Sequence, residues 1–479
     1  MENVENTDER LDASVERNAG QLIDTTRELL RIDTVSAAPA GPSSPFGDGL
    51  RRAMGFYLGL GREMGFTTCD VDGYAGHVEY GAGDEIVGVL SHLDVVLPGA
   101  GWSVPPFGAV ERNGALYARG AMDDKGPAMA TLWALRAVRE AGRPLRRRVR
   151  VIVGTDEELW WRCMAHYFTR EPRPTLGFTP DGVFPLVNVE KGVLTCTLHA
   201  WPEDVPHDES AARIVSLHGG ERPNVVPAHA ECLLALPSGR ADDAVARVRA
   251  YAATRGGRVG AAAEDRDHVH VWAAGAGAHA SRPSRGHNAI GELLLALDGL
   301  NLAGGRAGIL VRALAHRVGT AYDGAGLGVA LHDELSGSLT INLGLISGDA
   351  DGAQATFDVR YPVSYTAAEI EARVRGAVAG SGVSLSPIRE GDQAPHAVPA
   401  DGELVRTLRA VYRATVGGDD TPRSMGGVTY GRAAGNMVAF GPRLPGRPEL
   451  AHMPDEHIRL DDLVLLARIY ARAIYALAG

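Results

Sequence analysis

The stretch LSHLDVVLPGAGWSVPPFGAVERNGALYARGAMDDKGP, residues 90–127, decides how the rest of the chain is interpreted. It continues the apolar run IVGVL at residues 86–90, which predicts a short buried strand. His92 and Asp94 follow, and side chains two positions apart on a strand point to the same side. We therefore expect the imidazole to present one nitrogen to a metal ion while the carboxylate orients the ring from behind.

Further acids stand where other predicted elements begin or end. Asp123 opens a predicted helix that ends near Gly142, and aspartate suits the positive end of a helix dipole. Glu157 and Glu158 follow a buried strand predicted at residues 149–153, and the stretch 176–181 repeats the pattern, with a short strand followed by the acid Asp181. Open α/β sheets bind their ligands at the carboxyl ends of the strands, so these acids are expected at a site.

Composition limits the classes of function. A chain of 479 residues predicts two or three domains, and a net charge of −11 argues against nucleic acid or an anionic membrane as the main partner. We find no apolar run of about 18 residues, and the acidic first twenty residues are the reverse of a secretory signal. Four cysteines without C-x-x-C spacing indicate neither a disulfide framework nor a thiolate zinc site. A cytoplasmic enzyme is expected.

Four segments are predicted along the chain. Residues 1–17 are expected to be frayed, and alternating strands and helices at 18–192 predict a mostly parallel α/β sheet, with an edge strand at 77–80. Shorter strands mixed with helices at 193–388 predict an inserted domain made of two α+β units, although 301–336 cannot be assigned. Residues 389–479 are expected to return to the first domain, with a last helix capped by Asp461.

The polar groups left at the strand ends form one candidate constellation, which comprises His92, Asp94, Asp123, Glu157, Glu158, Asp181 and His452. Two imidazoles and several carboxylates, without a thiolate, are the ligand set of zinc, manganese or cobalt. Carboxylates that converge on one crevice repel one another unless cations hold them. Because there are more acids than one ion needs, we expect two divalent ions that share one bridging acid.

Several motifs occur in a fixed order along the chain, which are SHLDVV (91–96), GAMDDKGP (120–127), GTDEE (154–158), GFTPD (177–181), RPNVVP (222–227), GAHAS (277–281), FDVRYP (357–362), GVTY (427–430) and HMPDE (452–456). This series resembles the dinuclear zinc metallopeptidases of the peptidase V, carnosinase, aminoacylase and carboxypeptidase G group, and peptidase V-like dipeptidases most of all. The resemblance covers residues from about 85 to the C-terminus. It implies a catalytic domain with an inserted lid of two subdomains, a dipeptide substrate, and a monomer.

The resemblance also implies roles in the catalytic domain. It assigns His92 and Asp181 to one zinc ion, and Glu158 and His452 to the other. Asp123 would bridge the two ions, with a cis peptide bond to Asp124. Glu157 would be the general base, and Asp94 would support His92.

A second set of roles concerns the lid and a later loop. His279 resembles the histidine that stabilises the oxyanion, and Arg360 resembles the residue that holds the terminal carboxylate of the substrate. Asn224, together with Gly427 and Thr429 of the glycine-rich loop, is expected to position the substrate.

The chain departs from the family pattern beside these residues. Leu159 and Trp160 stand where relatives have Ser-Gly or Thr-Gly, and Val428 replaces a glycine. Tolerated variation is one interpretation. The other is an altered pocket, which would suit an unusual dipeptide, an N-acyl amino acid, or a biosynthetic and amide-forming reaction.

Overall fold

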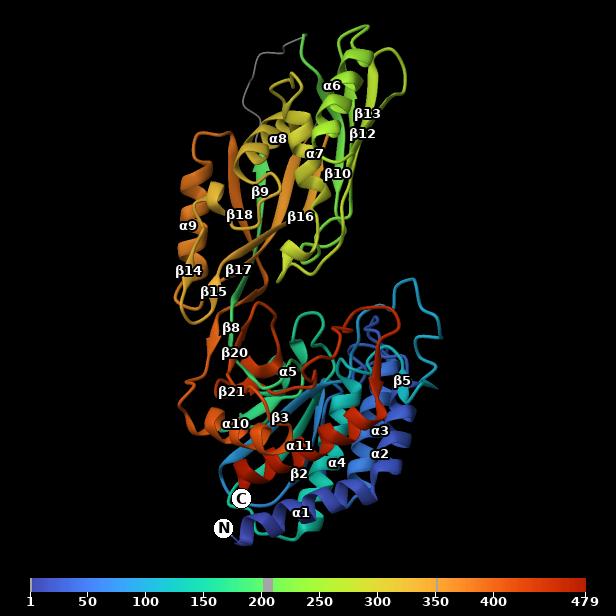
Figure 1. Ribbon diagram of the computed structural model, residues 1–479, viewed down its shortest axis with the longest axis vertical. Coiled ribbons are helices and arrows are strands. Elements are labelled where there is room, and N and C mark those ends of the chain that lie inside the picture. The colour runs from blue at the N-terminus through green and yellow to red at the C-terminus, as the bar shows by residue number, and fades with distance from the viewer. Residues whose placement is uncertain (1, 201–209, 350–351) are drawn as a thin grey trace. The chain divides into compact units, whose positions relative to one another are not determined.

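The computed structural model describes residues 2–200, 210–349 and 352–479, which form two compact units (Figure 1). Unit 1 consists of Met1–Val189, Ala397–Arg423 and Val428–Gly479, and unit 2 of Glu190–His396 and Ser424–Gly427. The predicted boundaries after residues 192 and 388 fall near these limits. The return of residues 424–427 to unit 2 was not predicted. No helix in the described ranges is long and apolar enough to cross a membrane.

Unit 1 is built on a mixed sheet covered by helices. Its helices are α1 (Glu2–Arg17), α2 (Ala19–Leu30), α3 (Asp48–Glu63), α4 (Lys125–Ala141), α5 (Arg162–Tyr167), α10 (Glu403–Thr415) and α11 (Leu460–Ala478). The sheet runs in the order β1 (Thr67–Val71), β2 (Ala75–Tyr80), β6 (Arg148–Gly154), β3 (Ile86–His92), β7 (Leu176–Thr179), β21 (Met437–Ala439), β8 (Val187–Glu190) and β19 (His396–Ala397), with β20 (Arg423–Met425) beside β8.

The four central strands of this sheet are parallel. β3 pairs in parallel with β6 and β7, and β7 pairs in parallel with β21. The strands outside this group, β1, β2 and β8, pair antiparallel. The predicted α/β class is confirmed, and its parallel part lies at the centre, where β3 is buried at every position because both faces of the sheet are covered.

The prediction of a frayed N-terminus is wrong. Residues 2–17 form α1, in which Leu11 and Val15 are buried because residues four apart share one face of a helix. Asp12 accepts two hydrogen bonds from the guanidinium of Arg472 in α11, at 3.1 and 2.7 Å. Most residues of this segment are polar, so its short apolar stripe was not recognised from the sequence.

Two smaller predictions also require correction. The strand at 77–80 is part of β2, which lies between β1 and β6, so β1 is the edge strand instead. Asp461 lies in the first turn of α11 and does not cap it, because the N-cap position belongs to Arg459. The predicted end of α4 is confirmed, since Gly142 adopts the left-handed conformation at its C-cap.

Unit 2 contains one continuous antiparallel sheet. Its strands run in the order β12 (Val259–Ala263), β13 (His268–Ala274), β11 (His229–Ala235), β10 (Arg213–Gly219), β16 (Thr340–Gly348), β17 (Ala353–Tyr361), β9 (Gly192–Ala200) and β18 (Val383–Gln393). Its helices are α6 (Ala241–Thr254), α7 (Ala289–Asp298), α8 (Arg306–Arg317) and α9 (Ala367–Val378). The two predicted α+β subdomains therefore join edge to edge, through the pairing of β10 with β16.

Helix α8 occupies part of the segment that the sequence left unassigned. Leu310, Val311 and Leu314 are buried in the core of unit 2. The surrounding Gly and Ala residues weaken the apolar periodicity on which a sequence-based assignment depends.

Candidate metal centre

The parallel strands of unit 1 bring the predicted acids together. His92 is the last residue of β3, Glu157 and Glu158 follow β6, and Asp181 follows β7. These neighbouring strands run in the same direction, so their carboxyl ends meet at one edge of the sheet.

A short sheet positions Asp123 and His452, the two members of the constellation that do not follow a strand of the main sheet. β22 (His457–Arg459) pairs with β5 (Ala115–Tyr117), which pairs with β4 (Val110–Arg112). This pairing places the loop that carries His452 beside the segment that leads to Asp123. The peptide bond between Asp123 and Asp124 is cis.

Asp123 lies between the two histidines. Its Oδ1 is 3.0 Å from Nε2 of His92, and its Oδ2 is 3.1 Å from Nε2 of His452. Nε2 of His92 is 3.9 Å from Oδ2 of Asp181, and Nε2 of His452 is 3.1 Å from Oε1 of Glu158. Two groups of possible ligands result, and Asp123 belongs to both.

The distances within each group suit coordination of an ion. In the first group, His92, Asp123 and Asp181 each offer an atom within 4.8 Å of the others, and Asp123, Glu158 and His452 do so in the second. Nε2 of His92 is buried and makes no hydrogen bond to any residue that the structure describes, although Oδ1 of Asp123 is near. A buried histidine nitrogen that lacks a hydrogen-bond partner among these residues is suited to bind a metal ion.

The carboxylates of this cluster are crowded. Burial and, after it, the charge of Asp123 raise the pKa of Asp181 to about 8. Burial also raises the pKa of Glu157 well above its ordinary value, and Asp181 adds to that shift. Burial opposes the ionisation of Asp123, but the neighbouring His452 and His92 lower its pKa. Cations would offset the repulsion among these acids.

Asp94 holds His92 through its backbone rather than through its carboxylate alone. Nδ1 of His92 is 3.0 Å from the carbonyl oxygen of Asp94 and 3.6 Å from Oδ1. Because a carbonyl only accepts, Nδ1 carries a proton and Nε2 faces Asp123. The other carboxylate oxygen, Oδ2, accepts the backbone N–H of Glu158 at 2.9 Å, so Asp94 fixes both a histidine and a neighbouring acid.

Glu456 is a buried acid whose role the sequence did not indicate. Its carboxylate accepts the backbone N–H groups of Gly120, Met122 and Asp123, at 3.2, 2.8 and 3.1 Å. Arg119 donates to it at 2.6 Å. Glu456 thus shapes the loop that presents Asp123. The only sequence signal was its place at the end of the HMPDE motif.

In unit 2, Asn224 and His279 are neighbours. The carbonyl of Asn224 accepts the N–H of Ala280 at 2.9 Å, and Val225 forms a β-bridge with His279. Nδ1 of His279 accepts the N–H of Ser281 at 3.1 Å, so the proton of the neutral ring is on Nε2. His279 is exposed and presents Nε2–H as a donor.

Arg360 is held rigidly in unit 2. It is 5% exposed, and it binds Asp358 through two hydrogen bonds, at 2.6 and 2.8 Å. Nη1 also donates to the carbonyl of Gly426 at 3.0 Å, immediately before Gly427. The guanidinium of Arg360 is therefore already paired with a carboxylate.

The chain matches, over residues 88–476, the family model described as Peptidase family M20/M25/M40. The chain belongs to this family. It is a metallopeptidase, and the family uses divalent metal ions. It is 41% identical to the "Putative dipeptidase YtjP" of Bacillus subtilis over 472 residues, which cover 98% of this chain and 99% of the relative. It is 33% identical to the "Putative dipeptidase SH1171" of Staphylococcus haemolyticus, over 97% and 98% of the two chains.

Solved structures of M20 peptidases share the fold. Human carnosine dipeptidase 1 superposes with a TM-score of 0.58 at 13% identity, and each chain is covered to 98%. An M20 family metallo-carboxypeptidase from Sulfolobus solfataricus gives a TM-score of 0.56 at 14% identity, with 95% of this chain and 99% of that chain covered.

Two of the residues that depart from the M20 pattern directly follow Glu158 of the acid cluster. Leu159 and Trp160 follow Glu158 in a turn and are 48% and 46% exposed. Val428 is half-buried, whereas Thr429 is buried and its hydroxyl accepts the N–H of Gly431 at 3.0 Å. The two exposed apolar side chains are thus not used for core packing.

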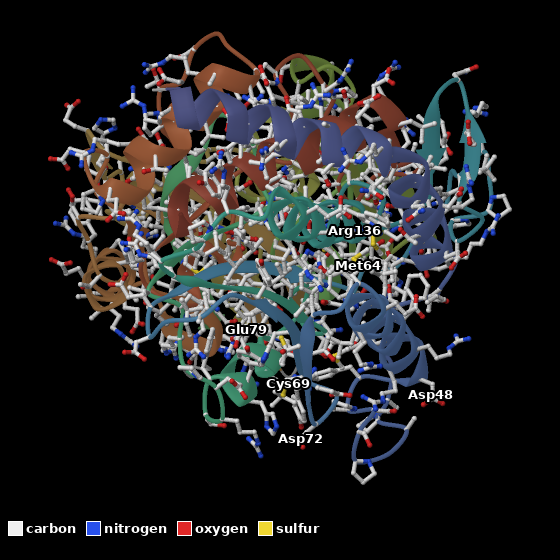
Figure 2. The ribbon with its side chains drawn as sticks, turned by 90° about the horizontal axis from the view of Figure 1, so that it is seen from below. Asp48, Met64, Cys69, Asp72, Glu79 and Arg136 are labelled. Atoms are coloured by element: carbon white, nitrogen blue, oxygen red, sulfur yellow. The ribbon has the colours of Figure 1, made fainter. Side chains whose placement is uncertain are left out.

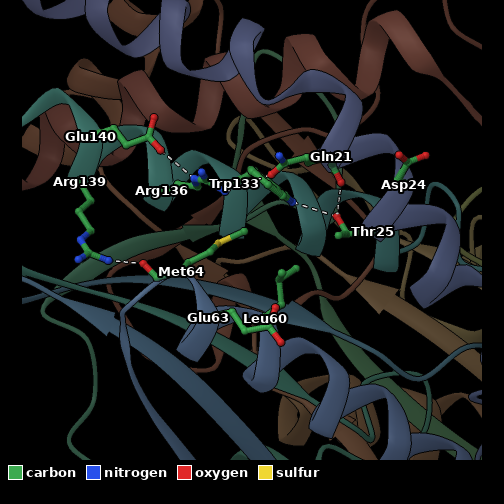
Figure 3. A pocket seen from close by; sticks show the side chains of 10 residues that line it. All are labelled: Gln21, Asp24, Thr25, Leu60, Glu63, Met64, Trp133, Arg136, Arg139 and Glu140. Carbon is green, nitrogen blue, oxygen red and sulfur yellow. Dashed lines mark hydrogen bonds and ion pairs between the residues drawn. The ribbon is translucent and has the colours of Figure 1, made fainter.

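A separate pocket in unit 1 has a volume of about 560 Å³ (Figure 3). It lies among α2, α3 and α4 and is lined by Gln21, Asp24, Thr25, Leu60, Glu63, Met64, Trp133, Arg136, Arg139 and Glu140. None of these residues belongs to the acid cluster, so this pocket is not the metal centre.

Proposed function

We propose that the protein is a dipeptidase that hydrolyses a dipeptide or dipeptide-like amide with two divalent ions, most readily zinc, although manganese and cobalt suit the same ligands. The observation that carries this proposal is the position of Asp123, whose two oxygens face different histidines at 3.0 and 3.1 Å. His92 and Asp181 would hold one ion, and Glu158 and His452 the other. Two ions so placed lower the pKa of a water molecule and polarise the scissile carbonyl.

Glu157 is the proposed general base. It stands beside Glu158 at the carboxyl end of β6, and its raised pKa makes its carboxylate a stronger proton acceptor than an ordinary glutamate. In this role it takes a proton from the attacking water and delivers it to the leaving amine. Asp94 keeps His92 in the required orientation.

Residues of unit 2 are proposed to recognise the substrate. Nε2–H of His279 would donate to the oxygen that becomes negatively charged, because its tautomer is fixed by the N–H of Ser281. Asn224, Gly427 and Thr429 would position the substrate. Arg360 would bind the carboxylate of the substrate. Its guanidinium also donates to Asp358 and to the carbonyl of Gly426, and these contacts hold it in place.

A second function is favoured by one observation. Leu159 and Trp160 are large, apolar and about half exposed beside Glu158. An apolar acyl group would contact these side chains better than a charged α-amine would, which favours an N-acyl amino acid as substrate. Dipeptides with and without a free α-amine distinguish the two functions.

The test is the metal content of the purified protein, measured together with the hydrolysis of a dipeptide panel after addition of zinc, manganese or cobalt. At least two ions per chain and metal-dependent release of amino acids support the proposal. Bound ions without cleavage of any dipeptide direct attention to N-acyl substrates. No bound ion after supplementation contradicts the assignment of the ligands.

A further inference from the structure

A second group of metal-binding residue types lies at the opposite flank of the sheet in unit 1. Cys69 is on the edge strand β1, His77 is its direct cross-strand partner on β2, and Glu171 follows α5. In the view of Figure 2, Cys69 lies between Glu79 and Asp72. Directly opposed residues of an antiparallel pair extend from the same face, so the thiol and the imidazole are neighbours.

The three side chains converge on one point. Cys69, His77 and Glu171 each offer one ligand atom, and these atoms all lie within 4.8 Å of one another. His77 is buried, whereas Cys69 and Glu171 are partly exposed, which leaves an entry path for an ion. The other three cysteines of the chain are buried.

Neighbouring side chains fix the orientation of two of these residues. Nδ1 of His77 is 2.8 Å from the hydroxyl of Tyr167, whose ring meets the imidazole edge to face. Arg150 donates to Oε2 of Glu171 at 2.7 Å and to Glu79 at the same distance. Outer partners of this kind hold the ligands of a metal site in place.

We propose that Cys69, His77 and Glu171 bind one divalent ion of the zinc class, with water completing the coordination. A thiolate and an imidazole select such an ion over magnesium or calcium, and three protein ligands plus one open position are a known zinc arrangement. Binding converts the thiol of Cys69 to a thiolate and releases one proton. The ion would tie the edge strand to β2 and to the segment after α5.

The charges around the site permit a cation. Arg150 and Arg148 bring positive charge, but Glu79 and Glu171 pair with Arg150, and the thiolate adds a further negative charge. Burial and these two arginines lower the pKa of His77 to about 3, so its ring is neutral at physiological pH, as a metal ligand must be. The proposal does not depend on the function of the cluster around Asp123.

Cobalt(II) is the probe that isolates this site. A thiolate ligand gives Co²⁺ a charge-transfer absorption, and the cluster around Asp123 contains no thiolate. We expect the full-length protein to develop this absorption band, and its intensity should stop rising once one Co²⁺ per chain is bound at this site. Cys69→Ser should abolish the band and lower the total Co²⁺ bound by one per chain. Glu171→Gln should weaken the affinity, and the buried thiol variant Cys232→Ala should behave as wild type.

Three results would overturn the proposal. The wild-type protein could develop no charge-transfer band, the band could persist in Cys69→Ser, or it could form only at millimolar Co²⁺. If Cys69→Ser does not fold, the wild-type protein supplies the test. Zn²⁺ should slow the reaction of Cys69 with a thiol reagent at least tenfold, and an unchanged rate would contradict the site.

Discussion

In unit 1, the acids around Asp123 crowd two histidines, whereas in unit 2 the charge of Arg360 is already matched by Asp358. The first group has shifted pKa values and a buried histidine nitrogen without a hydrogen bond among the described residues. The second group is held by two hydrogen bonds, at 2.6 and 2.8 Å. The difference is one of charge: carboxylates are crowded in the cluster of unit 1, which favours a cation there, whereas Arg360 in unit 2 already has its counter-ion.

Removal of the shared acid should cause the largest loss. Asp123→Asn weakens both groups of ligands. Because bound ions would stabilise the transition state by several kcal/mol, kcat/KM should fall by about 10⁴. Metal analysis of the same sample should show two fewer ions per chain. Asp84→Asn, at an exposed position, serves as the matched control and should change neither value.

Glu157→Gln separates proton transfer from metal binding. The variant should retain the ions of the wild-type protein, while kcat falls by about 10³, within the range for loss of a general base. Steady-state kinetics and metal analysis on one preparation give both numbers. Loss of ions together with activity would instead make Glu157 a ligand.

His279→Ala addresses unit 2. Because Nε2–H is the proposed donor, kcat should fall by about 10² and KM should change little. Metal content should stay at the wild-type value. His279→Gln, which keeps a donor, should recover part of kcat. A rise in KM alone would assign His279 to ground-state binding.

The pH dependence of stability should differ between the metal-free and the metal-loaded protein. A carboxyl whose pKa rises from 3.8 to about 8 on folding binds more protons in the native state between these values, so stability falls as pH rises through this window. For Asp181 the slope is at most about 1.4 kcal/mol per pH unit. Denaturant unfolding from pH 4 to 8 should show this decline without ions, and Zn²⁺ or Asp181→Asn should reduce it. An identical slope in all three samples would contradict the crowding of carboxylates.

Replacement of Leu159 by Ser and Trp160 by Gly should have the smallest effect. Loss of two apolar contacts should change the ratio of kcat/KM between substrates by about tenfold, in favour of ordinary dipeptides. Leu335→Ser, at a leucine of similar exposure in unit 2, is the control. An unchanged substrate profile would mean that the departure from the M20 pattern is tolerated variation.

The sequence predicted the arrangement in unit 1 because several of the candidate metal-binding residues follow strands. His92, Glu158 and Asp181 stand directly after apolar runs, and parallel strands bring such positions together. Asp123 and His452 come from loops, and their assignment required the family resemblance. Asp94 acts partly through its carbonyl, which no side-chain pattern encodes.

Other features could not be predicted from the sequence. Helix α1 is stabilised by α11, and contacts between segments so distant in sequence leave no local signal. The pairing of Arg360 with Asp358 lies within the FDVRYP motif, yet two charged residues two positions apart do not reveal which of them faces a ligand. The union of the two predicted subdomains depends on strand pairing between β10 and β16, which apolar periodicity does not specify.

The most direct test of the central claim is the anomalous scattering of crystals grown with Zn²⁺, recorded at the zinc absorption edge. At this cluster two peaks roughly 3.5–4 Å apart are expected, one on either side of Asp123 and separate from any peak at Cys69. One should contact His92 and Asp181, and the other Glu158 and His452. A single peak, or none within coordination distance of Asp123, would contradict the two-ion site.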